Sequence, residues 1–185
     1  MFEPLEIPGL LLIRPRRHQD SRGYFTETFS EDVFAGHNLP RFVQDNESMS
    51  QRAGTIRGLH YQTEPFAQAK LVRCTAGSIL DVAVDLRTGS PTFGRHDAVK
   101  LSAADGALLY IPIGFAHGFC TLAADTIVAY KVSKPYSPAH EVGLAWDDPQ
   151  LGIRWPVDSA AAILSDRDRR HPGLASLPAA FAWAN

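Results

Sequence analysis

The chain has 185 residues, of which 45% are hydrophobic and 21% are charged, as in an ordinary globular domain. Eighteen Lys and Arg against 20 Asp and Glu give a net charge of about −2, so no broad basic surface indicates binding to nucleic acid or to a membrane. No stretch approaches the roughly 20 apolar residues that span a bilayer, and the start lacks a signal-peptide pattern. Two cysteines without CxxC spacing predict buried thiols in a reducing cytoplasm. This length predicts one domain over residues 1–185.

The first third of the chain predicts short strands and one short helix. Ser30 can cap a helix over 30–34, because two acidic residues follow it in the first turn. Turn chemistry at 20–23 separates two strand-like segments. Gln44 and Asn46 share a face of a further strand and indicate either a polar surface or a pocket that binds a flat heterocycle. The strands are expected over 10–13, 24–29 and 42–48.

Short strands continue to residue 133, at intervals of about ten residues. They are expected over 71–74, 77–86, 99–102, 108–111 and 126–133, with Gly, Pro and Asp between them. In the second of these, Asp81 and Ala83 face away from Leu80 and Val82. This spacing predicts an all-β antiparallel sandwich or barrel. Residues 158–164 predict a helical or irregular stretch, and the tail beyond them a loose cap on the core.

The segment from Arg57 to Lys70 gathers the groups most suited to chemistry. Strand alternation predicts that Arg57, Leu59 and Tyr61 share one face and that His60 lies on the other. Two cations and one titratable base indicate an anionic substrate that gives up a proton.

A second motif has the form Pro112-x-Gly114-x-x-His117 and is similar to the second motif of cupins, which are small jelly-roll barrels. The first cupin motif normally supplies a His-x-His pair and an acidic ligand. Here those positions read His60-x-Gln62 and Lys70. Two histidines beside an ammonium are a poor set for a divalent cation, so we expect the barrel but no metal.

Taken together, the motifs resemble the deoxythymidine-diphosphate (dTDP)-4-dehydrorhamnose 3,5-epimerases of rhamnose biosynthesis over about residues 7–172. The matching segments occur in the same order along both sequences. They are Asp20-x-Arg22-Gly23-x-Phe25-x-Glu27, Gln44-x-Asn46-x-Ser48, Arg57-Gly58-Leu59-His60, Gln68-x-Lys70, Asp81 to Arg87, Ser90 to Gly94, Ile111 to Phe119 and Leu164-Ser165-x-x-Asp168. The resemblance implies a cupin-type double-stranded β-helix with short flanking helices.

The resemblance also implies epimerisation at C3 and C5 of a dTDP-4-keto-6-deoxyhexose without a cofactor. His60 would be the base and Asp168 its partner, Tyr130 the proton donor, and Lys70 the cation that stabilises the enolate. An imidazole titrates near pH 6.5, which suits proton abstraction at neutral pH.

The remaining implied residues bind substrate. They are Arg22 and Arg57 at the diphosphate, Gln44, Asn46 and Glu27 near the base, Tyr136 stacked on thymine, His117 at the sugar, and Phe25, Glu141 and Arg167 at further positions. In the family the segment over about 1–50 crosses to the partner subunit, which implies a homodimer.

Three other functions stay open at this point. The first is epimerisation at C3 alone or C5 alone, or a related ketoisomerase reaction, on another deoxysugar nucleotide. The second is a cupin that binds a sugar nucleotide without catalysis. The third is a metal-dependent cupin oxygenase.

Overall fold

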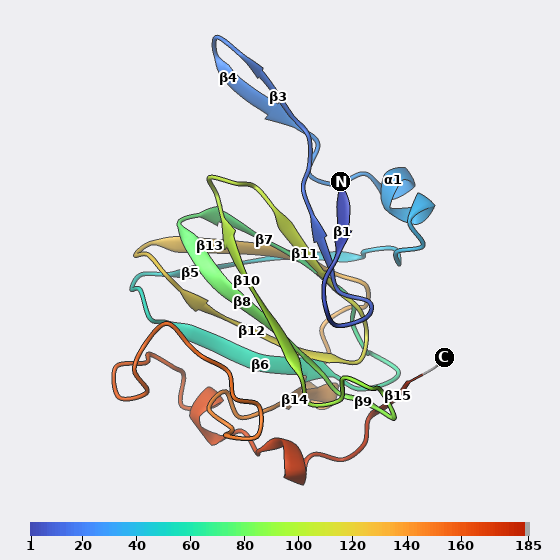
Figure 1. Ribbon diagram of the computed structural model, residues 1–185, viewed down its shortest axis with the longest axis vertical. Coiled ribbons are helices and arrows are strands. Elements are labelled where there is room, and N and C mark those ends of the chain that lie inside the picture. Colours follow the sequence, from blue (N-terminus) through green and yellow to red (C-terminus); the bar gives the residue numbers. More distant parts are fainter. Residues whose placement is uncertain (184–185) are drawn as a thin grey trace.

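The computed structural model describes residues 1–183, and two facing β-sheets form its body (Figure 1). Within this range one sheet has six strands, in the order β1 (Phe2–Pro4), β2 (Leu11–Ile13), β11 (Leu108–Ile111), β7 (Lys70–Ala76), β13 (Thr126–Val132) and β5 (Gln44–Ser50). The other, within the same range, has five strands, in the order β10 (His96–Ser102), β8 (Ser78–Asp85), β12 (Phe115–Thr121), β6 (Ile56–Gln62) and β14 (Glu141–Gly143).

Strands in both sheets pair antiparallel, and most neighbours are not consecutive in the sequence. Chain crossing between two facing antiparallel sheets is the topology of a jelly-roll barrel. The alternate residues of each strand that point inward form the main core, which includes Val72, Ile79, Leu109 and Val128. The predicted all-β jelly roll is therefore confirmed, and the strand periodicity that predicted it corresponds to this core.

After β1 and β2, a part of the N-terminal segment over residues 17–26 extends away from the body (Figure 1). Strands β3 (Arg17–Asp20) and β4 (Gly23–Thr26) form a two-stranded hairpin, joined by the predicted turn. The strand expected to reach residue 29 ends at Thr26. The predicted helix is present as α1 (Glu31–Gly36), where Phe34 is buried against aromatic neighbours, but the Ser30 side chain makes no capping hydrogen bond.

The C-terminal segment covers the outer face of the five-stranded sheet (Figure 1). Among the described residues it contains three short 3₁₀ helices and a last strand, which are η1 (Pro138–His140), η2 (Asp168–Arg170), η3 (Leu174–Ser176) and β15 (Phe181–Ala182). Strand β14 lies between η1 and η2 in the sequence and belongs to the five-stranded sheet. Strand β15 pairs parallel with β9 (Arg87–Thr88). Leu174, Leu177 and Phe181 pack on a second core cluster, which includes Leu59 and Val82 of the five-stranded sheet. The tail therefore caps the core as predicted, but the cap is not loose, because its apolar residues, spaced by Pro and Ala, pack on the sheet and are partly buried there. Residues 158–164 are irregular, one of the two outcomes expected.

No helix within residues 1–183 is long and apolar enough to cross a membrane.

Candidate active site

Two adjoining cavities lie between the sheets and share the side chains of His60, Lys70 and Tyr130. The first has a volume of about 530 Å³ and the second about 360 Å³. His60 comes from β6 in the five-stranded sheet, whereas Tyr130 and Lys70 come from β13 and β7 in the facing sheet. A substrate between the sheets would therefore have the imidazole on one side and the phenol on the other.

An irregularity in β6 places Arg57 and His60 in the same cavity, where simple alternation predicted opposite faces. On the neighbouring strand, His117 pairs with His60 and Phe119 with Arg57, so two steps along β12 correspond to three along β6. Such a β-bulge reverses the inward and outward order of the side chains beyond it. Gly58 lies in the bulge with a φ of 123° and approaches Gly118 so closely that a side chain there would overlap the backbone. The alternation prediction was wrong for this reason.

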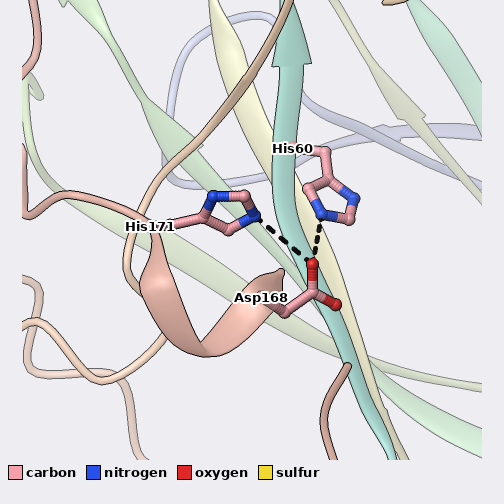
Figure 2. Close-up of side chains that lie close together, drawn as sticks. All are labelled: His60, Asp168 and His171. Carbon is pink, nitrogen blue, oxygen red and sulfur yellow. Dashed lines mark hydrogen bonds and ion pairs between the residues drawn. The ribbon is translucent and has the colours of Figure 1, made fainter. Parts of the chain in front are cut away.

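His60 and Asp168 form a hydrogen-bonded pair, 2.7 Å from Nε2 to Oδ1 (Figure 2). Asp168 lies on η2, its side chain is buried, and its Oδ2 accepts the amide of Gly58 at 3.5 Å. Burial alone would raise the pKa of Asp168, but the hydrogen bond and charge of His60 lower it below the usual value. Asp168 is therefore ionised at neutral pH. Since it accepts from Nε2, the nitrogen of His60 left to take a proton is Nδ1.

Sequence reasoning missed His171, a second histidine on the same carboxylate. Its Nε2 lies 3.3 Å from Asp168 Oδ1, the same oxygen that His60 contacts (Figure 2). The spacing of three residues was a usable signal, because a 3₁₀ turn has three residues and aligns positions 168 and 171.

Lys70 lines both cavities beside the base. Its Nζ donates to the His60 carbonyl at 3.1 Å. Burial lowers the pKa of Lys70 from 10.5 to about 8, against the opposing effect of the Asp81 and Glu141 charges. The ammonium remains the main form at neutral pH and can stabilise an oxyanion in the cavity.

Asp81 is the buried acid that Lys70 and His117 share, and it was not among the expected site residues. It is 0% exposed, and both of its oxygens lie 3.0 Å from His117 Nε2. Burial lowers the pKa of His117, with Asp81 opposing this effect and Lys70 adding to it. A carboxylate on the inward face of an apolar strand lowers the stability of the fold unless it has a partner. An acidic residue in such a strand was therefore the signal in the sequence that could have indicated Asp81.

Tyr130 stays protonated over the neutral range. Burial raises the pKa of its phenol, the Glu141 charge raises it further, and Arg57 acts in the opposite direction. The group is therefore a proton donor rather than a base near pH 7.

Polar side chains of the second cavity form a continuous hydrogen-bonded edge. Gln44 Nε2 donates to Asn46 Oδ1 at 2.8 Å, and Gln44 Oε1 accepts from the Tyr136 amide at 3.1 Å. The Tyr136 hydroxyl donates to Glu141 Oε2 at 2.7 Å, and Glu141 also pairs with Arg167 at 2.6 Å. Because Arg167 lines the first cavity, this chain of contacts joins the two cavities.

Two guanidinium groups, those of Arg57 and Arg167, give the first cavity a positive side. Arg57 is held by donation from Nε to Ser50 Oγ at 3.1 Å and from Nη2 to the Met49 carbonyl at 2.9 Å. A fixed guanidinium is suited to a diphosphate.

Three expected binding residues lie outside both cavities of this chain. Arg22, Phe25 and Glu27 are on or next to the protruding β3–β4 hairpin. Phe25 is 71% exposed, and Arg22 pairs with its neighbour Asp20, 2.6 Å away. A single chain does not bring these residues to the site.

The groups at the cupin metal position do not fit a divalent cation. Gln62 turns its amide nitrogen to the carbonyls of Phe66 and Pro135, at 2.7 and 3.2 Å, and Lys70 places an ammonium in the cavity. A different group of possible ligands, His60, Asp168 and His171, has its ligand atoms within 4.8 Å of one another. These three are joined by hydrogen bonds, with both imidazoles directed at one oxygen.

A paired imidazole, a facing phenol and a partly buried ammonium inside a cupin-type barrel define an acid–base isomerase site. The family model described as dTDP-4-dehydrorhamnose 3,5-epimerase matches residues 4–176. The chain therefore belongs to the dTDP-4-dehydrorhamnose 3,5-epimerase family, which confirms the resemblance found in the sequence.

Individual relatives agree with this membership. A dTDP-4-dehydrorhamnose 3,5-epimerase from Sinorhizobium fredii is 52% identical, over 98% of this chain and 93% of its own. The structure of a 3,5-epimerase from Legionella pneumophila in complex with dTDP-4-keto-L-rhamnose has a TM-score of 0.95 at 39% identity, covering 100% of this chain and 99% of that one. A 3′-monoepimerase from Streptomyces bikiniensis in complex with dTDP-quinovose has a TM-score of 0.87 at 39% identity, covering 94% and 87%.

Proposed function

We propose that the protein epimerises C3 and C5 of dTDP-4-dehydro-6-deoxy-D-glucose, giving dTDP-4-dehydro-L-rhamnose. The observation that carries this proposal is that His60 and Tyr130 line the same cavities from opposing sheets, with Lys70 in the same space. Inversion next to a ketone needs a base on one face of the sugar, an acid on the other, and a positive group at the enolate oxygen.

In this mechanism, Nδ1 of His60 takes the proton from the carbon next to the C4 ketone. The C–H electrons form the enolate double bond, and the negative charge moves to the C4 oxygen. Lys70 stabilises that oxygen, and Asp168 stabilises the imidazolium that forms. Tyr130 then delivers a proton to the opposite face of the carbon as the C4 ketone re-forms, which inverts the centre. The His60 imidazolium afterwards gives its proton to solvent, and the Tyr130 phenolate takes one from solvent, which restores the site. His117, held by Asp81, contacts the sugar.

The nucleotide would occupy the remaining cavity space. Arg57 and Arg167 supply positive charge for the diphosphate. Gln44 and Asn46 offer amide groups to the thymine, and Tyr136, held by Glu141, presents a ring for stacking. We assign no resident metal or cofactor to this reaction, since the ketone of the substrate itself makes the neighbouring protons acidic.

We further propose a homodimer in which the segment over about 1–50 of each single-domain chain reaches its partner. The exposure of Arg22, Phe25 and Glu27 on a protruding hairpin supports this arrangement, because they would complete the partner's nucleotide site. Sedimentation analysis tests it against the 20.3 kDa mass of one chain. We place the enzyme in the cytoplasm, where nucleotide sugars and free thiols such as Cys74 and Cys120 belong.

The decisive experiment incubates the enzyme with the keto-sugar nucleotide in deuterated water and locates the deuterium by NMR. Deuterium at both C3 and C5 supports the proposed double epimerase. Deuterium at one carbon identifies a single epimerase, the alternative favoured by similarity to the 3′-monoepimerase. Deuterium at neither carbon, with binding intact, identifies a binding protein and overturns the proposal. Stoichiometric iron, manganese or zinc in the purified protein would favour the oxygenase.

His60→Ala gives the matching test of the base. Exchange should be abolished while nucleotide binding persists, because the pocket residues that hold the nucleotide remain. His96→Ala, on β10 and outside both cavities, is the control and should exchange like the wild type. Exchange near the wild-type rate in His60→Ala would remove His60 from the mechanism.

A further inference from the structure

His171 is a largely buried residue next to the proposed base, His60. It follows η2 directly, and its side chain is only 8% exposed. Its ring lies against Gly143 of β14, where any side chain would overlap the imidazole. Gly143 pairs with His60 across β14 and β6, so the glycine leaves space for His171 beside the base. The two imidazole rings meet edge to face, with centroids 5.4 Å apart.

The two histidines bind Asp168 unequally. Oδ1 accepts from His60 at 2.7 Å and from His171 at 3.3 Å, whereas Oδ2 accepts from the Gly58 amide at 3.5 Å. Two donors on one oxygen hold the carboxylate against rotation. They also divide its negative charge, so less of that charge is available to stabilise a protonated His60.

We infer that His171 is a positioning residue that fixes the Asp168 carboxylate and weakens its hold on the His60 imidazolium. This inference rests on the proposed function, since it concerns the same base. It goes beyond that function by adding a third member to the His60–Asp168 pair.

The charge state of His171 supports this role. Burial lowers its pKa, the charge of His60 lowers it further, and Asp168 opposes both. The ring is therefore a neutral Nε2–H donor near pH 7. The charged or titratable groups around the pair come from several elements: His60 and Arg57 on β6, Asp168 and Arg167 at η2, Glu141 on β14, Lys70 on β7, His117 on β12 and Tyr130 on β13.

Two substitutions distinguish the effect of the Nε2–H donor of His171 from the effect of the volume of its ring. His171→Leu fills the space without a donor. His171→Gln keeps an amide nitrogen near the Nε2 position and cannot titrate. In His171→Leu, more of the Asp168 charge acts on His60, so the acid limb of the pH profile of kcat/KM should move to higher pH by about half a unit. We expect kcat at pH 7 to fall about three- to tenfold, with KM changed less than twofold. His171→Gln should restore both quantities.

The assay is deuterium exchange from solvent into the substrate between pH 5 and 9, with His96→Gln as a control outside the site. An unchanged acid limb in His171→Leu, or equal loss of kcat in His171→Gln and His171→Leu, would show a merely structural role and overturn the inference. NMR titration of ¹⁵N-labelled imidazoles in the free protein gives a second readout that needs no turnover. There the His60 signal should titrate at higher pH in His171→Leu than in the wild type, and identical titration would contradict the inference. If the wild type exchanges no deuterium, the proposed function fails, while the titration still decides the role of His171.

Discussion

Replacing Lys70 by Met tests whether the barrel holds a cation that costs stability and serves catalysis. Lys70 is partly buried, and its Nζ donates a hydrogen bond to the His60 carbonyl. Methionine has a similar length and no charge, so it suits an apolar cavity wall. We expect kcat to fall by about 10² to 10³, the usual loss when a donor to an oxyanion is removed.

The magnitude of the stability effect follows from the pKa. A pKa lowered from 10.5 to about 8 corresponds to about 3 kcal/mol against the ammonium in the folded state. This value already includes the attraction of Asp81 and Glu141 for the ammonium. The variant also loses the hydrogen bond to the His60 carbonyl, which reduces the gain, so we expect Lys70→Met to be about 1–3 kcal/mol more stable than the wild type at pH 7.

The direction in which this stability difference changes with pH follows from the number of protons that Lys70 binds in each state. Between pH 8 and 10.5 the unfolded wild type binds more protons at Lys70 than the folded protein, so wild-type stability rises with pH relative to the variant. From pH 7 to 9.5 the difference between the two proteins should shrink by about 2 kcal/mol. Urea unfolding at both pH values measures it. Lys100→Met, an exposed lysine on β10, is the control and should show no such change. A difference that is the same at pH 7 and 9.5 would refute the reasoning.

Two further substitutions test the groups around Lys70. Tyr130→Phe should still exchange deuterium into the substrate, because His60 is intact, but should lose inversion by at least about 10²-fold; normal inversion, measured by NMR of the product, would show that Tyr130 is not the acid. The wild-type pH profile of kcat/KM should fall on its alkaline side near pH 8, as Lys70 loses its proton. Asp81→Asn should move this limb to lower pH, because the Asp81 charge raises the pKa of Lys70. A limb that stays in place or moves to higher pH would contradict the interaction of Asp81 with Lys70.

Much of the fold was predictable because strand periodicity and turn residues are local properties. Strands β5 to β8, β11 and β13 correspond to predicted segments, with boundaries shifted by a few residues, whereas β12, which carries His117 into the cavity, was not predicted as a strand. Contacts between residues far apart in the sequence were not predictable in this way. The parallel pairing of Phe181 with Arg87 joins residues far apart in the chain, and a tail rich in Ala and Pro carries no strand signal of its own.

The bulge in β6 limited the prediction of the site in a similar way. Arg57 and His60 share a cavity because of one additional residue opposite β12, and strict alternation cannot anticipate an irregular pairing with another strand. Asp81 and His171 act through partners, His117 and Asp168, which the sequence places 36 and three residues away. Their importance became visible only when the distances were known. For Arg22, Phe25 and Glu27 the situation is reversed. The sequence predicted their role, but one chain does not show it, because that role depends on a second chain.

A crystal structure with the keto-sugar nucleotide, or an unreactive analogue, in the cavity would test the central claim most directly. The account predicts that the sugar ring lies between the sheets, with Nδ1 of His60 and the Tyr130 hydroxyl on opposite faces and each within about 3.5 Å of a carbon next to the C4 position. Lys70 Nζ should lie within hydrogen-bond distance of the C4 oxygen. A sugar with both groups on the same face, or one bound away from His60, would contradict it.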